Sequence, residues 1–215
     1  MRVRTNLSSS ALPRAEDRSQ HARRARSRAA LLEATARAVS RSGYANLVLE
    51  RVAHDAGYTR GALDHQFKDK DDLVLATVHW VDEAWRAEVG ELIDREATPL
   101  GALRAFARGH AVFCRRDIAR VAVALRVELG DTDHPVGQEV ERISETGYKR
   151  VARLIKAGRQ DGSIPDGPPA RVLARAFVGA VEGTVIALRG AAPHDAVLAE
   201  QAAQGVLGAR SAEAQ

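Results

Sequence analysis

The sequence predicts an all-α protein with an N-terminal helix-turn-helix segment of three helices and a larger C-terminal helical domain, about nine helices in total. The chain has 215 residues and is 45% apolar but only 4% aromatic, which is typical of helices packed through small side chains. Apolar residues recur at spacings of three and four, and no alternating run typical of a strand is present. Turns rich in Gly, Pro and Asp separate these segments.

The first helix is expected to begin between His21 and Arg28 and to end near Gly43. Its apolar stripe consists of Leu31, Leu32, Thr35, Ala38 and Val39. Residues 1–20 are rich in Ser and Arg and show no periodicity, so they are predicted to be disordered. We therefore divide the N-terminal part into a basic arm, residues 1–22, and a helical domain, residues 23–72.

Two short helices and a tight turn follow. The first of them has an apolar face made of Leu49, Val52, Ala53 and Ala56. Gly57 comes directly after this face, where a left-handed residue ends a helix without a Cβ penalty. Thr59 is expected to cap the second short helix, residues 60–67, which keeps Leu63 and Phe67 on its inner face. The spacing therefore predicts a helix-turn-helix.

The outer face of that second helix is polar and small. It carries Arg60, Gly61, Ala62, Asp64 and His65. Asp69 then caps a third helix. Entry into a DNA major groove requires a short polar-faced helix held across a glycine turn. Any small three-helix bundle with a tight corner could show the same spacing, so the pattern alone leaves both interpretations open.

The residues themselves resemble the N-terminal domain of the tetracycline-repressor (TetR) family of bacterial transcription regulators. The matching letters are Leu31 to Ala34, Ala38, Gly43-Tyr44, Val52-Ala53, Ala56-Gly57, Thr59, Gly61 to Leu63, Phe67-Lys68 and Lys70 to Leu73. The resemblance covers roughly a fifth to a quarter of the chain. It implies a DNA-binding domain, a helical ligand-binding and dimerisation domain, and a dimer that represses at a pseudo-palindromic operator until a small-molecule effector releases it.

The resemblance also assigns DNA contacts. Bases would face Arg60, Gly61, Ala62 and His65, and phosphates would face Thr59 and Lys70. Arg28 and Asp64 are further candidates for DNA contact. Two departures stand out. The family usually has Thr or Ser where this chain has Leu47 and Val48, and neither side chain here can cap the helix or bond to DNA. It usually has Tyr in place of Asp64, whose carboxylate repels phosphate but could accept from a cytosine amino group.

Positive charge is concentrated at the N-terminus. Residues 1–28 contain eight Arg against Glu16 and Asp17, a net charge of +6, so the remainder must carry −2 to give the overall +4. One interpretation is a solvated tail without function. The other is an arm that adds salt-dependent affinity for DNA, in which case deleting residues 1–22 should weaken operator binding and flatten its salt dependence.

The C-terminal domain, residues 73–208, is expected to begin within a long helix, residues 70–97, with Gly90 as its weak point and Leu73, Thr77, Trp80, Ala84 and Leu92 facing inward. Five helices are predicted to follow, at residues 100–115, 117–129, 136–160, 170–189 and 195–207, and residues 209–215 are predicted to be a disordered tail.

The last two helices, about residues 170–207, are predicted to form a homodimer. The predicted apolar faces are Phe177, Val178, Val181, Val185 and Leu188 on one helix and Val197, Leu198, Ala202 and Leu207 on the other. Gly179, Ala180 and Gly183 would allow close backbone approach. A two-fold four-helix bundle would bury both faces, although the helices could instead simply cover the core of one subunit.

Aromatic and polar residues on the body helices are candidates for lining a ligand cavity. They are Trp80, Trp85, Phe106, His110, Phe113, Leu125, Arg126, Glu128, Tyr148, Phe177 and Glu182. Glu128 and Glu182 interrupt apolar helices, so each is exposed, paired or in contact with ligand. His110 and Cys114 share a face at i, i+4, which is compatible with metal ligands but more typical of a buried thiol beside a polar group.

No catalytic motif is present, so we predict no enzyme, and neither a cofactor nor a metal site is expected. The single cysteine, the lack of an apolar signal segment and the lack of a run long enough to span a bilayer favour a cytoplasmic protein. The predicted function is a ligand-responsive DNA-binding repressor. The alternative is a helical small-molecule-binding protein whose head no longer reads DNA sequence.

Overall fold

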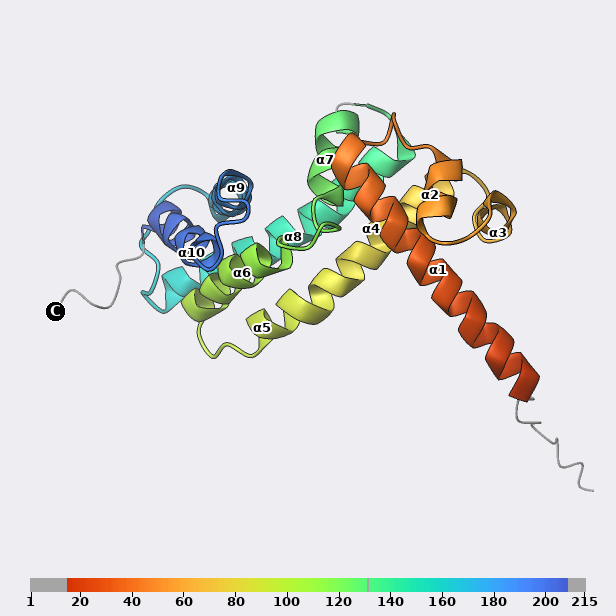
Figure 1. The fold of residues 1–215 in the computed structure, drawn as a ribbon. Helices are drawn as coiled ribbons and strands as arrows, with labels where there is room; N and C mark the ends of the chain where they lie inside the picture. Colours follow the sequence, from red (N-terminus) through yellow and green to blue (C-terminus); the bar gives the residue numbers. More distant parts are fainter. Residues whose placement is uncertain (1–14, 131, 209–215) are drawn as a thin grey trace, which may run out of the picture.

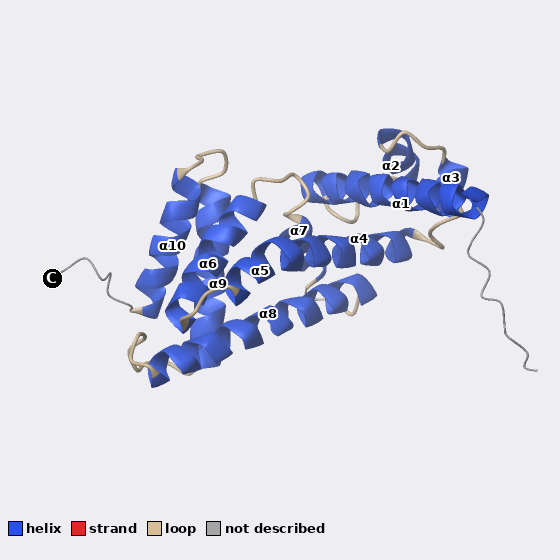
Figure 2. Cartoon of the chain, turned by 90° about the horizontal axis from the view of Figure 1, so that it is seen from below, coloured by secondary structure: helices blue, strands red, loops and turns tan. Residues whose placement is uncertain are grey.

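The computed structural model describes residues 15–130 and 132–208, and every regular element in these ranges is helical (Figures 1 and 2). The elements are α1 (Ala15–Ser42), α2 (Leu49–Asp55), α3 (Arg60–Asp64), α4 (Lys70–Trp85), the π-helix η1 (Arg86–Gly90), α5 (Glu91–Asp94), α6 (Pro99–Phe113), α7 (Val121–Leu129), α8 (Pro135–Gln160), α9 (Ala170–Ala187) and α10 (His194–Leu207). With α4, η1 and α5 counted as one interrupted helix, the described residues contain nine helices. The prediction of an all-α chain is confirmed.

Helices α1, α2 and α3 gather at one end of the molecule, which we call the head, and α9 and α10 lie at the opposite end (Figure 1). Helices α4 to α10 form the body. The head contacts the body where α1 packs on α4 and α7. Within the body, α9 packs between α8 and α10, and α10 also packs on α6. Helix α4 therefore belongs to both parts and connects them.

Helix α1 begins at Ala15, earlier than the sequence predicted. Residues 15–22 of the predicted disordered arm are therefore helical. The early turns lack an apolar stripe, but Ala, Glu, Gln and Arg in this segment favour a helix. This part of α1 extends away from the other head helices, and its Arg23, Arg24 and Arg26 are exposed (Figure 1). Residues 1–14 of the arm and the predicted tail, residues 209–215, lie outside the described residues.

The long connecting helix is interrupted. Asp69 caps α4 as predicted, because its side chain accepts a hydrogen bond from the amide of Asp72 at 2.9 Å. The π-helix then runs to Gly90, the predicted weak point, and the helix ends at Asp94 rather than at residue 97. A π turn holds more residues than an α turn, so the apolar stripe loses its register. Leu92, predicted to face inward, is consequently 44% exposed.

The body helices match the predicted segments with two shifts. Helix α7 begins at Val121 rather than at residue 117, and α9 ends at Ala187. The fully buried side chains of Leu103, Leu125 and Ile155 join α6, α7 and α8 into one core. Burying each of them contributes about 2 kcal/mol to folding.

Candidate DNA-binding surface and ligand cavity

The turn between α2 and α3 follows the predicted geometry. Gly57 has φ +79°, the left-handed conformation that glycine adopts without strain. The hydroxyl of Thr59 accepts a hydrogen bond from the amide of Ala62 at 3.2 Å and so caps α3. Leu63 and Phe67 are 1% and 2% exposed, which fixes α3 against the head core. Helix α3 itself ends at Asp64, so the predicted helix over residues 60–67 closes in a turn.

The outer face of α3 carries the predicted residues. Gly61, Asp64 and His65 are exposed, while Arg60 and Ala62 are partly exposed. Arg60 is paired twice: its Nε donates to Asp64 at 2.8 Å and its Nη1 donates to Glu50 on α2 at 2.6 Å. All three side chains remain at least 40% exposed. Arg60, the arginine expected to read bases, therefore lies between two carboxylates. Its ion pair with Glu50 could not be predicted from the sequence spacing.

The candidate phosphate contacts come from different elements. The guanidinium of Arg28 on α1 lies 4.5 Å from the ring centre of Phe67, so it sits beside the end of α3. Lys70 stacks over the ring of Tyr44 with its Nζ 4.2 Å from the ring centre, and also donates to the carbonyl of Ala45 at 3.4 Å. Thr59 is exposed at the start of α3. The structure thus places Lys70 against the loop that joins α1 and α2.

The missing cap on α2 is confirmed. Val48 occupies the N-cap position and makes no side-chain hydrogen bond there. Leu47, the other residue that departs from the family pattern, is 6% exposed and joins the hydrophobic core. Leu47 therefore stabilises the head by packing, Val48 is 53% exposed, and neither side chain offers a hydrogen bond to DNA.

The carboxylate of Glu128 connects the body to the head. Glu128 on α7 accepts hydrogen bonds from the backbone amides of Tyr44 and Ala45, both at 2.6 Å. Nearby, the hydroxyl of Tyr44 donates to Asp71, and the His134 ring packs edge-on against Tyr44 with ring centres 4.8 Å apart. Burial and the adjacent Asp71 raise the pKa of Tyr44 to about 12, so the hydroxyl keeps its proton. We call these contacts the head–body junction.

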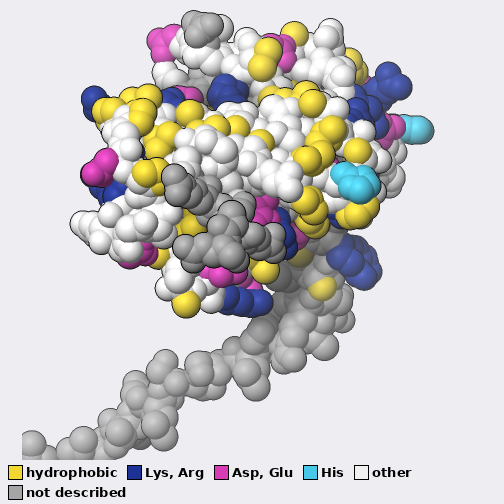
Figure 3. Space-filling view, turned by 90° about the vertical axis from the view of Figure 1, so that its left-hand side faces the viewer, with side chains coloured by type: hydrophobic (Ala, Val, Ile, Leu, Met, Phe, Trp, Pro, Cys, Tyr) yellow, Lys and Arg dark blue, Asp and Glu magenta, His cyan; other side chains and the backbone are white. Residues whose placement is uncertain are grey.

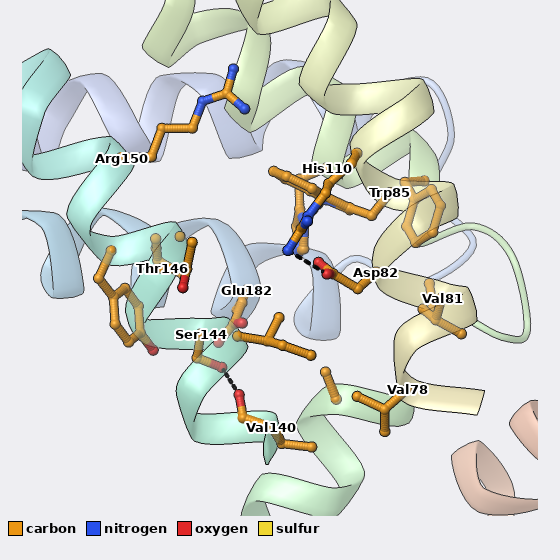
Figure 4. Close-up of a pocket in the computed structure, with 18 of the residues that line it drawn as sticks. Val78, Val81, Asp82, Trp85, His110, Val140, Ser144, Thr146, Arg150 and Glu182 are labelled. Atoms are coloured by element: carbon orange, nitrogen blue, oxygen red, sulfur yellow. Dashed lines mark hydrogen bonds and ion pairs between the residues drawn. The ribbon is translucent and has the colours of Figure 1, made fainter. Parts of the chain in front are cut away.

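The body contains a cavity of about 430 Å³ between α4, α6, α7, α8 and α9. Figure 4 shows Val78, Val81 and Trp85 on the α4 side facing residues of α8 across this space. Its walls are mostly apolar, and its volume lies in the range typical of small-molecule sites.

The cavity includes seven of the eleven candidates, namely Trp85, Phe106, His110, Phe113, Arg126, Tyr148 and Glu182. Four expectations need correction. Trp80 packs against the core outside the lining, and Leu125 and Phe177 are fully buried in the core. Glu128 points to the head–body junction. Helical spacing places a residue on a face but does not show which neighbouring helix that face meets.

Paired charges line the cavity. Arg126 donates to Glu182 at 2.5 Å and to the hydroxyl of Tyr148 at 3.1 Å. The side chains of Arg126 and Glu182 are only 28% and 19% exposed. Asp82 pairs with Arg86 at 2.6 Å. Four further residues line the cavity and were not predicted to do so: Asp82, Arg86, Arg150 and Arg153. Charged residues at helical spacing are also typical of an ordinary solvated helix face, so no local signal distinguished them.

His110 lies in the cavity wall with Cys114 beside it, and both groups are neutral. The Nδ1 atom of His110 lies 3.1 Å from Nε1 of Trp85, whose N–H donates to it, and Nε2 lies 3.4 Å from the Cys114 sulfur. Burial lowers the pKa of His110 to about 4, and burial raises the pKa of Cys114 to about 12. Neutral pH therefore leaves an uncharged imidazole and a protonated thiol, which is a poor nucleophile.

Within residues 15–130 and 132–208, no group of three or more His, Cys, Asp or Glu has a metal-binding arrangement. In the same ranges, none of the helices is both long enough and apolar enough to cross a membrane.

Comparison with known proteins identifies the head. The sequence model of the bacterial regulatory proteins of the tetR family matches residues 31–77, which span the end of α1 through the first half of α4. The HTH-type transcriptional regulator BetI of Paraburkholderia phymatum is 37% identical over 79 residues, a match that covers 36% of this chain and only 40% of that protein.

Two further comparisons extend over the body. BetI of Pectobacterium atrosepticum is 25% identical over 174 residues, which covers 80% of this chain and 86% of that protein. The crystal structure of SCO4454, a TetR-family transcriptional regulator from Streptomyces coelicolor, is similar with a TM-score of 0.71 and 24% identity, over 86% of this chain and 95% of that chain. The fold is therefore shared across both head and body.

Proposed function

The chain is a TetR-family transcriptional regulator, and from this premise we propose that it is a dimeric repressor whose binding to a pseudo-palindromic operator is released by a small-molecule effector. Residues 23–72 form the DNA-binding domain in this proposal, and residues 73–208 form the domain that binds effector and partner subunit. The proposal includes no catalytic step.

In the complex with DNA, α3 enters the major groove. The bases then face Arg60, Gly61, Ala62, Asp64 and His65, while Arg28, Thr59 and Lys70 lie at phosphates. Arg60 is the residue able to donate twice to a guanine. Its two carboxylate partners are exposed, so exchanging one of them for a base costs little.

The dimer forms through α9 and α10. Figure 3 shows hydrophobic side chains on the face at this end of the molecule, and the exposed ones on these two helices are Val172, Ile186, Val197 and Leu198. Gly179 and Gly183 are exposed on α9, with open space where a Cβ would lie. A partner helix can therefore approach this face closely.

The predicted apolar face of α9 is wrong in detail. Phe177, Val178 and Val181 are at most 8% exposed and pack into the core of one subunit. The broadest apolar face of α9 therefore packs against other helices of the same subunit. The dimer contact must use the other exposed side of the helix. A dimer places two recognition helices on one side of the DNA, in half-sites about 34 Å apart.

One observation carries the link between effector and DNA. Helix α7 places Arg126 in the cavity wall and, two residues on, Glu128 at the head–body junction. A ligand that moves Arg126 therefore moves the anchor of the loop between α1 and α2. Effector and DNA need only prefer different positions of α7 for each to weaken binding of the other.

The test is binding of the full chain to the DNA upstream of its own gene, measured by fluorescence anisotropy across a salt series. We expect tight, sequence-selective binding with a steep salt dependence. The control is Arg60→Ala, which should remove selectivity among related sequences, a loss of about 1–3 kcal/mol in discrimination, and leave the dimer intact by light scattering. Selectivity retained by Arg60→Ala would contradict the assignment of the reading surface.

A second function is favoured by the contacts of Arg60. Its pairing with Glu50 and Asp64, together with the uncapped Val48, is what a helical small-molecule-binding protein with a non-reading head would also show. This alternative predicts weak binding that is equal for the upstream DNA and a scrambled duplex of the same composition. The same salt series therefore decides between the two functions.

A further inference from the structure

The charges that line the effector cavity are not balanced. Four arginines, at 86, 126, 150 and 153, face two carboxylates, Asp82 and Glu182. His110 adds no charge, because burial lowers its pKa to about 4. The lining therefore has a net charge of +2 at neutral pH.

Both lining carboxylates are already paired. Asp82 bonds to Arg86 at 2.6 Å, and Glu182 bonds to Arg126 at 2.5 Å. A cationic ligand would have to compete with an arginine for either carboxylate. The excess positive charge belongs to the remaining two lining arginines, Arg150 and Arg153.

Arg150 and Arg153 lie three residues apart on α8, so they face the same side of that helix. Arg153 is exposed and pairs with no carboxylate in the part of the chain that the structure describes. Arg150 is only 27% exposed, and its sole carboxylate partner there, Asp94, is 75% exposed. Figure 4 shows Arg150 at the edge of the space, away from Val78 and Val81. Charge therefore gathers at one edge of the cavity.

Apolar side chains from α4, α6 and α8 form another part of the lining. They include Val78, Val81, Val140, Ile143 and Phe106. Hydrocarbon fits against these side chains, while a charged or strongly hydrated group there would lose its water without a partner.

We propose that the effector is an amphipathic organic anion, with its apolar body between α4 and α8 and its anionic group at Arg150 and Arg153. This inference rests on the proposed function, since it names the chemical class of the effector. A carboxylate is the simplest such group, because guanidinium binds it with two parallel hydrogen bonds.

The same site adjoins the π-helix. Arg150 donates to the carbonyl of Gly90, the last residue of η1, at 3.3 Å, and to Asp94 at 2.6 Å. A bound anion competes with both acceptors for the guanidinium. Effector binding therefore weakens the contact between α8 and η1. Because η1 continues directly from α4, which packs on α1 of the head, this change can reach the head.

The experiment is a calorimetric titration of the full chain, without DNA, with three ligands that share one alkyl chain: decanoate, decanol and decyltrimethylammonium, each below its micelle concentration. We expect decanoate to bind about tenfold or more tightly than decanol, and the cation to bind most weakly. Arg153→Gln and Arg150→Gln should each weaken decanoate binding about tenfold and leave decanol unchanged. Arg153→Gln removes no internal ion pair of the described residues, so it tests the charge without loss of fold.

The matched control is Lys149→Gln, which removes a cation from the exposed surface of the same helix, outside the cavity lining. It should leave decanoate binding unchanged. Equal binding of the three ligands, preference for the cation, binding by none, or decanoate affinity unaffected by both arginine variants would each overturn the proposal.

Anisotropy of bound operator DNA, measured with the same ligands, separates the two proposals. Selective binding of decanoate without any change in DNA affinity supports the ligand class and contradicts effector control of DNA binding. Release of DNA by decanol or the cation alone supports effector control and contradicts the ligand class.

Discussion

The recognition helix and the effector cavity both pair arginine with carboxylate, but in different surroundings. Arg60 and its partners Glu50 and Asp64 are at least 40% exposed, whereas Arg126 and Glu182 are 28% and 19% exposed between apolar walls. An exposed pair contributes little and exchanges partners easily. A buried pair is costly to break, because removing one partner leaves the other charge without compensation. The head is thus suited to exchange partners with DNA, and the body to hold a fixed arrangement until a ligand enters.

The largest expected effect is a loss of folding stability in acid, and it arises in the body. The pKa of His110 is lowered by burial from 6.5 to about 4 in the folded body. Between these values the unfolded chain binds a proton that the folded chain does not. The stability that neutral His110 supports is therefore fully present above pH 6.5 and is lost as the pH falls towards 4. The loss from this group approaches about 3 kcal/mol at pH 4.

The measurement is urea unfolding at neutral pH and near pH 4.5, for the natural chain and for His110→Gln, whose amide oxygen can still accept from Trp85. The variant should lose less stability on acidification than the natural chain. An identical loss in both proteins would show that other groups set the acid sensitivity.

Breaking one pair in each region gives the next largest effect. Arg126→Met leaves Glu182 partly buried without its cation, which should cost about 2 kcal/mol of the free energy of unfolding. Arg60→Met removes an exposed cation and should cost much less. Urea unfolding of both variants at neutral pH checks the difference.

The control for the body is Arg126→Met combined with Glu182→Met, which removes both charges from the cavity wall. It should recover most of the stability that Arg126→Met loses. Equal costs for the two single arginine variants would mean that burial does not distinguish the two pairs.

The head was also easier to predict from sequence than the cavity, because its main features depend on residues that are close together in the chain. Gly57, Thr59 and Asp69 act on residues within three positions of themselves, so their roles follow from spacing. The cavity is assembled from five helices, and its lining depends on which faces meet. Thus Arg126 was placed correctly, while Glu128, two residues away on the same helix, points to the head.

The pairing of Arg60 with Glu50 shows the limit even within the head. The two residues lie on different helices, ten positions apart, and the sequence gives no signal that α2 turns Glu50 towards α3. Conversely, the π-helix was anticipated only as a weak point at Gly90. The π-helix contacts α6, and Arg150 of α8 donates to its last carbonyl, contacts that no local pattern encodes.

A substitution at Glu128 should uncouple ligand binding in the body from DNA binding by the head without unfolding either region. Glu128→Gln keeps one carbonyl acceptor for the amides of Tyr44 and Ala45 but loses the charge and one of the two bonds. We expect DNA affinity and ligand affinity to be nearly kept, and the effect of ligand on DNA affinity to fall by about 1 kcal/mol, roughly fivefold. Anisotropy titrations with and without ligand measure this coupling.

Glu91→Gln is the control for Glu128→Gln, because Glu91 is an exposed carboxylate on α5, outside the cavity lining, and its partner Arg95 is also exposed. It should leave the coupling unchanged. Coupling that survives in Glu128→Gln would mean that α4 alone transmits the effect of ligand to the head.

The smallest expected effect is a change in the salt dependence of DNA binding when arginines near the start of α1 are removed. Arg23 and Arg26 are exposed on a part of the helix that extends away from α2 and α3, so removing them should not change the fold. If each contacts a phosphate, the double variant Arg23→Gln with Arg26→Gln reduces the slope of log affinity against log salt by about 2. Anisotropy across a salt series gives that slope.

The control is Lys149→Gln with Lys156→Gln, which removes the same charge from exposed positions on α8 and should leave the slope unchanged. Equal flattening by both pairs would assign the effect to net charge, and no change in either would make the N-terminal arginines a solvated surface.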